Sequence, residues 1–293
     1  MKATVRANAK INLSLDIVGK RDDDYHLLES VMQSVSLCDT VNVKLGTEEG
    51  GITVSTTGNS CIADDHTNTA YRAAAAFFDY TEIDNPGVSI RIKKAIPAQA
   101  GLAGGSADAA AVIVALDELL NTRLEPEQLC DIGERVGADV PFCILGGTML
   151  ARGTGNILSP LPDLPDCHIL ICKPEVSVST AAAYRTVDEQ GLTSPAECSE
   201  DISEAICGSD LEGVAKHLRN IFERVTDIPE VDSIKERMVR SGALGACMTG
   251  SGSAVFGIFD DADLAEDCAA ELRREYDEVF LTQPVSSGCE IDD

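Results

Sequence analysis

A loop of small residues at positions 97–107 is the first feature of this sequence that could carry chemistry. It reads PAQAGLAGGSA and leads directly into an apolar, helix-forming segment. Without bulky side chains, the backbone N–H groups of such a loop can approach an anion, and the following helix N-terminus adds partial positive charge. Ser106, at the junction, could cap the helix or offer its hydroxyl to a phosphate or to Mg²⁺. A single loop of this kind fits a phosphate site and a structural turn equally well.

The spacing of the glycines excludes two common phosphate motifs. No Gly-Lys-Ser/Thr follows them, as a Walker A loop requires, and the G-x-G-x-x-G of dinucleotide-binding proteins is missing. A second glycine-rich stretch, GACMTGSGS at 245–253, runs into the apolar segment 254–259 and could hold another anion by the same physics. Two such loops in one chain favour phosphate chemistry over a structural turn.

Lys10, Asn12 and Asp139 are further side chains whose types suit catalysis. Residues 3–17 alternate between apolar and polar side chains, which predicts a half-buried strand with Lys10 and Asn12 on its polar face. A lysine in mid-strand is either a solvated edge residue or a cation placed for function. Asp139 precedes Val140-Pro141, where it could be part of a helix end whose carboxylate binds backbone amides; the resemblance described below implies a different role.

Alternation and periodicity predict the elements that must position these residues. After the first strand they indicate a charged turn at 19–25 and strands at 31–43, 88–92, 148–152, 169–172 and 254–259. One helix is predicted at 67–78, a second begins directly after the small-residue loop, and a third begins near Pro126. Strands and helices mix without a regular βαβ alternation, which favours the α+β class. A loop rich in Gly and Pro at 153–165 predicts two lobes, an N-terminal domain at 1–157 and a C-terminal domain at 158–293.

Length and charge limit the classes of function. No apolar stretch approaches the ~18 residues of a membrane span, and the first residues lack the apolar segment of a signal peptide, so we expect a cytoplasmic protein that does not bind membranes. The formal net charge of −26 argues against a nucleic-acid partner, which requires a basic surface. A phosphate site in such a chain must be built locally from backbone N–H groups, a few lysines and Mg²⁺.

The eleven cysteines are irregularly spaced, and none forms a C-x-x-C pair. The four histidines do not cluster near them in the sequence, so zinc sites and disulfide frameworks are both disfavoured. Buried free thiols that pack as small apolar side chains explain most of the cysteines. The acidic end, residues 290–293, is expected to be disordered.

At the small-residue loop the sequence resembles the GHMP kinases, a family that includes galactokinase and the homoserine and mevalonate kinases. The run PAQAGLAGGSADAA at 97–110 looks like the ATP loop of that family. Three further motifs match in order, namely AKINL at 9–13, GADVPF at 137–142 and GACMTGSG at 245–252. The resemblance covers nearly the whole chain and implies a two-lobed α+β kinase with its nucleotide and substrate sites in the cleft between the lobes.

The resemblance also implies a role for each matching residue. Lys10 and Asp139 match the catalytic positions. The positions that match substrate contacts are Asn12, Tyr25, His26, Thr180, Tyr184, Gly250 and Ser251. The positions that match ATP contacts are Asn68, Lys94, Pro97, Ala98, Gln99, Ala100, Gly101, Leu102, Ala103, Gly104, Gly105, Ser106 and Ala107.

Tyr25, His26 and Tyr184 resemble the residues of one branch of the family, in which two aromatic rings hold a cytosine. The implied reaction is the ATP- and Mg²⁺-dependent phosphorylation of a hydroxyl on a small molecule that carries a cytidine diphosphate group, in the non-mevalonate route to isoprenoids. The implied enzyme is a monomer or a weak homodimer.

Two departures from the family pattern stand out. The residues before Tyr25 are three aspartates, at 22–24, where the family usually has Pro-Asp-Gly, so the presentation of Tyr25 is in question. Ala98, Gln99, Ala100 and Ala103 occupy loop positions that often hold glycine. Alanine still leaves the backbone N–H groups accessible, so we interpret the second departure as variation within the family.

Three other functions stay open at this point. Another kinase of the same superfamily, acting on homoserine or mevalonate, differs in sequence at Tyr25, His26 and Tyr184. A ligand-sensing relative without activity is disfavoured by the presence of both Lys10 and Asp139. A dinucleotide-binding oxidoreductase is disfavoured by the spacing of the loop glycines.

Overall fold

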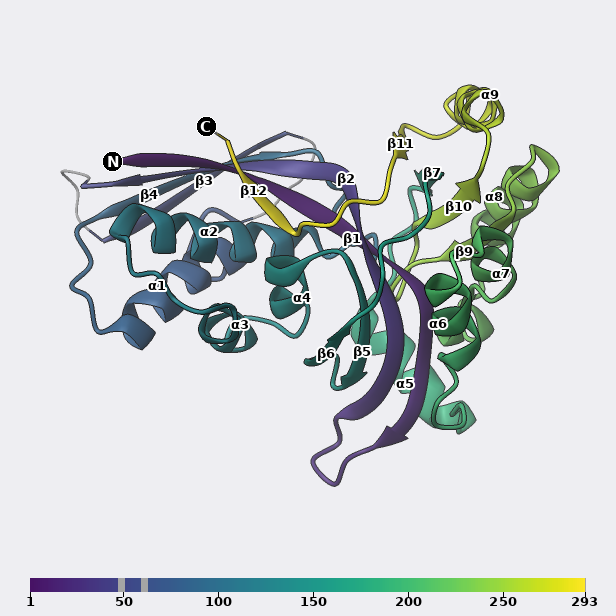
Figure 1. The fold of residues 1–293 in the computed structure, drawn as a ribbon, viewed down its shortest axis with the longest axis horizontal. Helices are drawn as coiled ribbons and strands as arrows, with labels where there is room; N and C mark the ends of the chain where they lie inside the picture. Colours follow the sequence, from purple (N-terminus) through teal and green to yellow (C-terminus); the bar gives the residue numbers. More distant parts are fainter. Residues whose placement is uncertain (47–50, 59–62, 293) are drawn as a thin grey trace.

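The computed structural model describes residues 1–46, 51–58 and 63–292, and these ranges form two lobes side by side (Figure 1). Each lobe has its own sheet. The larger apolar core fills the first lobe and extends onto one face of the second sheet, at Ile169, Ile171 and Phe256, and the smaller core lies on the other face of that sheet. Antiparallel pairs predominate, but β3 runs parallel to β4, and helices pack against both sheets. The predicted α+β class is therefore confirmed.

The first lobe is built on an eight-stranded sheet with the central order β12-β1-β2-β4-β3. In addition, β5 pairs with β2, β6 with β5 and β8 with β1. The strands are β1 (Lys2–Lys20), β2 (His26–Leu45), β3 (Ile52–Gly58), β4 (Val88–Lys94), β5 (Thr148–Gly153), β6 (Ile157–Pro160), β8 (Arg219–Asn220) and β12 (Cys289–Ile291).

Helices α1 to α4 lie together on one face of this sheet (Figure 1). They are α1 (Thr69–Thr81), α2 (Gly104–Leu120), α3 (Pro126–Glu134) and α4 (Val140–Leu145). Helix α2 packs directly against β1, and its buried face is largely alanine from Ala107 to Ala111. Short side chains let the helix approach the strand closely, which brings its N-terminus near the polar residues of β1.

The second lobe has a four-stranded antiparallel sheet in the order β11-β7-β10-β9. Its strands are β7 (His168–Lys173), β9 (Gly245–Met248), β10 (Val255–Phe259) and β11 (Glu278–Thr282). The helices of this lobe are α5 (Thr180–Gln190), α6 (Glu200–Cys207), α7 (Leu211–Lys216), the 3₁₀ helix η1 (Ile221–Arg224), α8 (Pro229–Arg240) and α9 (Ala262–Leu272).

The long ribbon of β1 and β2 runs from the first lobe to the second (Figure 1). Ile11 and Leu13 of β1 belong to the larger apolar core, whereas Leu15 and Ile17 belong to the smaller one. The pairing shifts register between Asn12 and Ser14, close to this crossing point. The polar face of β1 therefore lies at the junction of the two cores.

Most of the elements predicted from the sequence are present, with boundaries that differ by a few residues. The solvated-edge alternative for Lys10 is wrong, because Lys10 is 4% exposed and lies in a strand with neighbours on both sides. The expected disorder of the acidic end is wrong for Glu290 and Ile291, which pair with β1 in β12, while Asp293 lies outside the described residues. The domain boundary at 157/158 stays a prediction. The chain passes from the first sheet to the second after β6, and its last strand, β12, returns to the first sheet.

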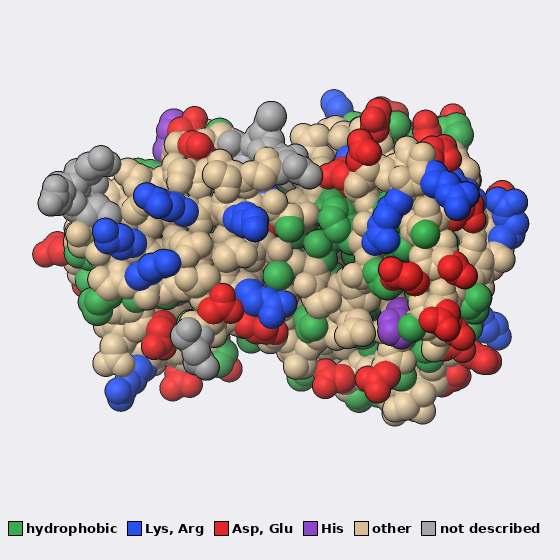
Figure 2. Space-filling view, turned by 90° about the horizontal axis from the view of Figure 1, so that it is seen from above, with side chains coloured by type: hydrophobic (Ala, Val, Ile, Leu, Met, Phe, Trp, Pro, Cys, Tyr) green, Lys and Arg blue, Asp and Glu red, His purple; other side chains and the backbone are tan. Residues whose placement is uncertain are grey.

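Cysteines and charges are distributed much as the composition suggests. The described cysteines are all free thiols, and half of these ten are buried. On the face in Figure 2, Asp and Glu side chains are spread around both halves, with Lys and Arg side chains between them. Within the described ranges, no helix has the length and apolar character needed to cross a membrane.

The two glycine-rich loops meet where the lobes join. A Cβ atom added to Gly101 would lie 2.0 Å from the carbonyl oxygen of Thr249, and one added to Gly250 would lie 2.8 Å from the Cα of Gly101. Both residues also have positive φ angles, +77° and +56°, which side-chain-bearing residues rarely adopt. Glycine at these positions allows the backbones of the two loops to touch.

We predict that Gly101→Ala destabilises the protein by about 2–4 kcal/mol, because the new methyl group overlaps the backbone of the second loop at an unfavourable φ. Urea unfolding of the purified variant measures the change. Gly19→Ala is the matched control, since its Cβ would meet only the Leu27 side chain at 3.6 Å, and it should cost less than about 1 kcal/mol. Equal stability of the two variants would contradict the contact between the loops.

Candidate active site

One cavity of about 830 Å³ between the lobes gathers most of the predicted site residues. Its walls come from the β1–β2 ribbon, the first glycine-rich loop, the start of α5 and the second glycine-rich loop. The predicted residues that line it are Lys10, Asn12, Lys94, residues 97–105, Asp139, Thr180, Tyr184, Gly250 and Ser251. Both glycine-rich loops thus face the same space.

Lys10 and Asp139 lie at the centre of this cavity. Lys10 Nζ is 3.8 Å from Asp139 Oδ2 and donates a hydrogen bond of 2.7 Å to Asn12 Oδ1. The Lys10 side chain is 5% exposed, whereas Asp139 is 38% exposed. Asp139 occupies the N-cap position of α4, but its side chain makes no hydrogen bond to the helix. The alternative in which its carboxylate binds helix amides therefore does not hold. Its carboxylate is left accessible to a ligand.

Asn12 joins β1 to the second glycine-rich loop. Its Oδ1 atom accepts hydrogen bonds from Lys10 Nζ and from the backbone N–H of Gly250, at 2.7 and 3.1 Å. Its own N–H donates to Thr249 Oγ1 at 3.0 Å, and its Nδ2 donates to Ser30 Oγ at 2.9 Å. Asn12 therefore fixes the position of Lys10 relative to the second lobe.

The first glycine-rich loop ends in the N-terminus of α2. Helix α2 begins at Gly104 with Ala103 as its N-cap, so the predicted capping role of Ser106 is wrong: Ser106 lies within the first turn. The first N–H groups of a helix have no acceptor within it and are available to an anion. Gln99 and Ala103 have φ angles of +51° and +57°. Both residues adopt the left-handed backbone conformation that glycine favours, which costs each of them roughly 1–2 kcal/mol of conformational free energy.

Lys94 lies behind this loop in a buried ionic cluster. Its Nζ donates to Asp39 Oδ2, to Asp108 Oδ2 at 2.6 Å and to the carbonyl of Gly104 at 3.4 Å. The Lys94 side chain is 2% exposed and Asp39 is fully buried. Asp39 also accepts the N–H groups of Ala95 and Ile96, just before the loop. The cluster thus ties β2, β4 and α2 together around the loop.

The cluster carries more negative than positive charge in a buried place. Burial is the main cause that raises the pKa of Asp108 to about 7, while Lys94 opposes the rise. Burial by itself lowers the pKa of Lys94, but Asp108 and Asp39 more than offset this and raise it. Asp108 Oδ1 is buried without a hydrogen-bond partner among the described residues. Asp108 is therefore the carboxylate of the cluster that binds a proton most readily.

Tyr184 and Thr180, from α5, line the other end of the cavity. Tyr184 packs edge-on against Phe222, with ring centroids 4.9 Å apart, and its other neighbour is His26 at 4.7 Å. Burial raises the pKa of Tyr184 to about 12, so its hydroxyl is neutral. Thr180 Oγ1 and Ser251 Oγ share a hydrogen bond of 2.7 Å. An aromatic ring and two hydroxyls from different segments thus line the same cavity as the first glycine-rich loop.

The turn that carries Tyr25 compensates for its missing glycine. Asp24 has a φ of +68°, a left-handed conformation that Asp tolerates better than most residues. Its carboxylate is 3.1 Å from Lys20 Nζ, and Asp23 pairs with Arg21 at 2.7 Å. Tyr25 is 64% exposed and does not line the cavity. Asp24 thus adopts a backbone conformation open to glycine, and the predicted contact of Tyr25 with a base stays a prediction.

Asn68, Ser106, Ala107 and His26 also lie outside the cavity wall. Asn68 caps α1, because its side chain accepts a hydrogen bond of 2.9 Å from the Ala70 N–H. The next residue, Thr69, donates a hydrogen bond of 2.7 Å from its Oγ1 to the carbonyl of Gly105. Asn68 is therefore adjacent in the chain to Thr69, whose hydrogen bond holds the end of the first glycine-rich loop. The predicted contacts of these four residues with ligands stay predictions.

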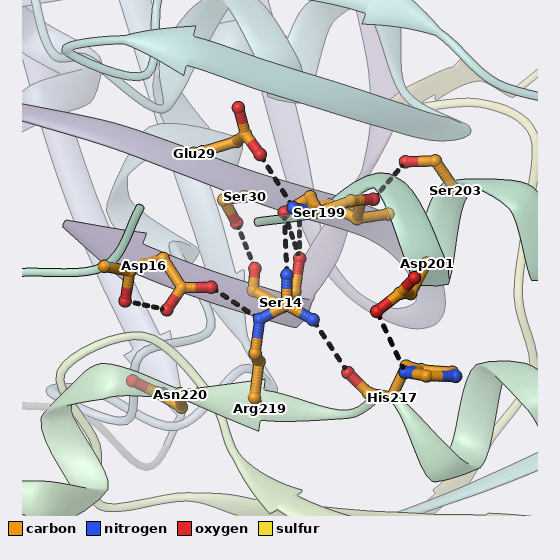
Figure 3. A network of polar contacts seen from close by, with 12 residues as sticks. Ser14, Asp16, Glu29, Ser30, Ser199, Asp201, Ser203, His217, Arg219 and Asn220 are labelled. Atoms are coloured by element: carbon orange, nitrogen blue, oxygen red, sulfur yellow. Dashed lines mark hydrogen bonds and ion pairs between the residues drawn. The ribbon is translucent and has the colours of Figure 1, made fainter. Parts of the chain in front are cut away.

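A polar network continues from the site into the second lobe (Figure 3). Ser30 Oγ donates to the carbonyl of Ser14 at 2.6 Å, and the Ser14 and Ser199 hydroxyls are 2.9 Å apart. The Ser199 N–H donates to the buried Glu29 at 2.7 Å, and Arg219 Nε donates to Asp16 at 2.6 Å. Since Ser30 also contacts Asn12, the network connects the β1–β2 ribbon beneath Lys10 to α6 and β8.

Sequence reasoning missed several residues of this site. Asp39, Asp108 and Glu29 are carboxylates in apolar or alternating segments, where an isolated buried charge requires a partner. That signal marks them as paired, but it does not say with which residue. Phe222 and Thr249 carry no such signal, because ordinary packing explains their types equally well.

Three kinds of comparison agree on the relatives of this chain. Residues 68–147 match the model of the GHMP kinases N-terminal domain, and residues 202–278 match that of the GHMP kinases C-terminal domain. A 4-diphosphocytidyl-2-C-methyl-D-erythritol kinase of Clostridium novyi is 40% identical over 282 residues, covering 96% of this chain and 99% of the relative. One of Alkaliphilus metalliredigens is 41% identical over 286 residues, covering 96% of each chain.

Solved structures show the same fold. A crystal structure of 4-(cytidine 5'-diphospho)-2C-methyl-D-erythritol kinase matches with a TM-score of 0.75 and 32% identity, covering 97% of this chain and 99% of that one. Homoserine kinase from Cytophaga hutchinsonii matches with a TM-score of 0.79 at 21% identity, covering 99% of this chain and 97% of that one. At 21% identity, the likeness to homoserine kinase shows the fold alone.

We predict that Lys94→Met costs about 3–5 kcal/mol of stability at pH 8, because Asp39 and Asp108 then remain buried without their cation. Urea unfolding measures this loss. The neighbouring Lys93→Met is the control, since Lys93 is exposed on the same strand and should change stability by less than about 0.5 kcal/mol. A Lys94→Met protein of normal stability with a raised KM for ATP would show instead that Lys94 acts as a nucleotide ligand.

Proposed function

This chain belongs to the GHMP kinase family, and we propose that it phosphorylates the 2-hydroxyl of 4-diphosphocytidyl-2-C-methyl-D-erythritol with ATP, in the non-mevalonate synthesis of isoprenoid precursors. The observation that carries the proposal is that Lys10 and Asp139, 3.8 Å apart, line the same cavity as the first glycine-rich loop and Tyr184. The curated relatives at about 40% identity over nearly the whole chain support the substrate. We further propose that the enzyme acts in the cytoplasm, as a monomer or weak homodimer.

The ATP loop and the N-terminus of α2 would hold the triphosphate. Residues 97–105 line the cavity with small side chains, which exposes the backbone N–H groups. The residues that line the cavity carry two cationic side chains, Lys10 and Lys94, and Lys94 is committed to its carboxylates. Lys10 is therefore the ammonium group best placed to neutralise charge on the transferred phosphoryl group.

A divalent cation fits the chemistry of the donors at this end of the site. Mg²⁺ prefers oxygen ligands, and it would neutralise charge on the phosphates when bound with ATP. Ser106 Oγ makes no hydrogen bond within the described part of the chain, and Asp139 presents an accessible carboxylate. Ser106 would hold the ion together with phosphate oxygens, and the Asp139 carboxylate is left for the reacting hydroxyl. In the described ranges, no cluster of three or more His, Cys, Asp or Glu side chains is arranged to bind a metal by itself.

Asp139 would act as the general base. It accepts the proton of the substrate hydroxyl as that oxygen forms its bond to the γ-phosphorus, while the bond from the γ-phosphorus to the bridging oxygen breaks and ADP leaves. An ordinary aspartate has a pKa of about 3.9 and is a weak base, so Lys10 is needed to stabilise the developing alkoxide. The separation of 3.8 Å leaves both groups able to approach one oxygen atom.

The first test is ADP release with Mg-ATP against the cytidine compound, homoserine, mevalonate and galactose. We expect turnover of the cytidine compound alone. Turnover of another panel member would overturn the substrate, and silence on all four would overturn the kinase activity.

We predict that Asp139→Asn lowers kcat by about 10²–10⁴-fold with KM nearly unchanged, because the proton acceptor is lost while the binding surface is kept. Steady-state kinetics with the cytidine compound measure this. Asp131→Asn, an exposed carboxylate on α3 outside the cavity, is the matched control and should retain activity. Wild-type turnover in Asp139→Asn would assign Asp139 a structural role.

A further inference from the structure

Asp188, on α5, is a carboxylate that the proposed chemistry leaves without a function. Its Oδ1 lies 2.6 Å from His26 Nε2, and its Oδ2 accepts from Lys20 Nζ at 3.0 Å. Asp188 is one helical turn beyond Tyr184, whose ring packs against His26 with centroids 4.7 Å apart. The carboxylate therefore connects the β1–β2 hairpin to the helix that supplies the aromatic wall of the cavity.

The charge of Asp188 determines how the histidine is used. Hydrogen bonds from His26 and then from Lys20 lower the pKa of Asp188, so the group is an ionised carboxylate that only accepts hydrogen bonds. The hydrogen in the short contact with His26 must then be carried by Nε2. In a neutral imidazole that leaves Nδ1 as an acceptor. Within the described residues, His26 Nδ1 makes no hydrogen bond, and the His26 side chain is 13% exposed.

We infer that Asp188 is a positioning residue for base recognition, which keeps the hydrogen of His26 on Nε2 and leaves Nδ1 to accept a hydrogen bond from an exocyclic amino group. The inference rests on the proposed function, because it assumes that a base binds beside Tyr184. It concerns which pyrimidine is accepted there.

Cytosine and uracil differ in the hydrogen bonds that such an acceptor can make. Cytosine carries an amino group at C4, which donates, whereas uracil carries a carbonyl oxygen at the same position, which only accepts. An acceptor held at Nδ1 therefore accepts a hydrogen bond from the amino group of cytosine and repels the carbonyl oxygen of uracil. If the hydrogen could move to Nδ1, the preference would be reversed. A fixed tautomer therefore gives discrimination that an unsupported histidine would not.

The arrangement also holds the histidine ring in place. His26 is the first residue of β2, immediately after the turn, and its ring lies between the Tyr184 face and the Asp188 carboxylate. Lys20, the last residue of β1, contacts both Asp188 and Asp24, so it neutralises the carboxylates on the hairpin side. Loss of Asp188 should affect the orientation and the tautomer of His26, whereas loss of Lys20 should leave the Nε2 contact in place.

The test compares the cytidine substrate with its uridine analogue in Asp188→Asn. We expect KM for the cytidine compound to rise about tenfold with kcat within about twofold, because one oriented hydrogen bond is lost. The ratio of kcat/KM for cytidine over uridine should fall by at least about tenfold. Asp188→Glu keeps an accepting carboxylate and should recover most of the preference. Lys20→Gln is the control and should change the ratio by less than about twofold.

A second measurement needs no turnover. Nitrogen-15 NMR of the ligand-free protein at pH 8 reports which ring nitrogen of His26 carries hydrogen. We expect Nε2–H in the wild type and a mixture of tautomers in Asp188→Asn.

The inference is overturned by an Nδ1–H or doubly protonated His26 in the wild type, by an unchanged pyrimidine preference in Asp188→Asn, or by an equal loss in Lys20→Gln. Failure of the wild type to phosphorylate the cytidine compound would instead overturn the proposed function, and the NMR result would still stand by itself.

Discussion

The hydrogen bond from Lys10 to Asn12 is the interaction on which the rest of the site depends. A buried ammonium group is costly unless partners hold it, and Lys10 finds them in Asn12 at 2.7 Å and Asp139 at 3.8 Å. Because Asn12 also binds Gly250 and Thr249, the position of the cation is tied to the second lobe. Strand β1 can serve this purpose because it crosses from one apolar core to the other. The predicted catalytic residues therefore lie where β1 passes between the two apolar cores.

Two ionic systems support this centre from opposite sides. The Lys94 cluster lies behind the ATP loop, and the Asp16, Glu29 and Arg219 network lies under the substrate side (Figure 3). Each joins segments that are far apart in the sequence, so each contact closes a long loop of chain. Buried ionic groups of this kind add little net stability compared with apolar packing, but they tolerate few alternative arrangements. Their contribution is to fix geometry around the cavity.

The sequence predicted the local features of the site well and its long-range contacts poorly. The small-residue loop and Lys10 could be found because small residues before a helix, and a charge on a strand, are unusual in themselves, whereas Asp139 was identified by resemblance to a family motif. The solvated-edge alternative for Lys10 failed because alternation does not show whether a polar face is covered by another lobe. The roles of Asp39, Asp108 and Asp188 could not be predicted, since each depends on a partner at least 14 residues away. The left-handed conformation of Asp24 could not be predicted either, because aspartate adopts it only where the surrounding contacts favour it.

A strongly anionic protein can bind polyanionic ligands because its excess charge lies outside the site. The net charge is −26, yet the charged side chains found along the cavity wall in the described ranges are Lys10, Lys94 and Asp139. Charges more than about 8–10 Å away are largely screened by physiological salt, whereas those in a cavity are not. The potential that a bound triphosphate experiences is therefore set by these three groups, by Asp39 and Asp108 behind Lys94, and by the N-terminus of α2. Selection for surface acidity could proceed without changing the field at the phosphates, because the two sets of charges do not overlap.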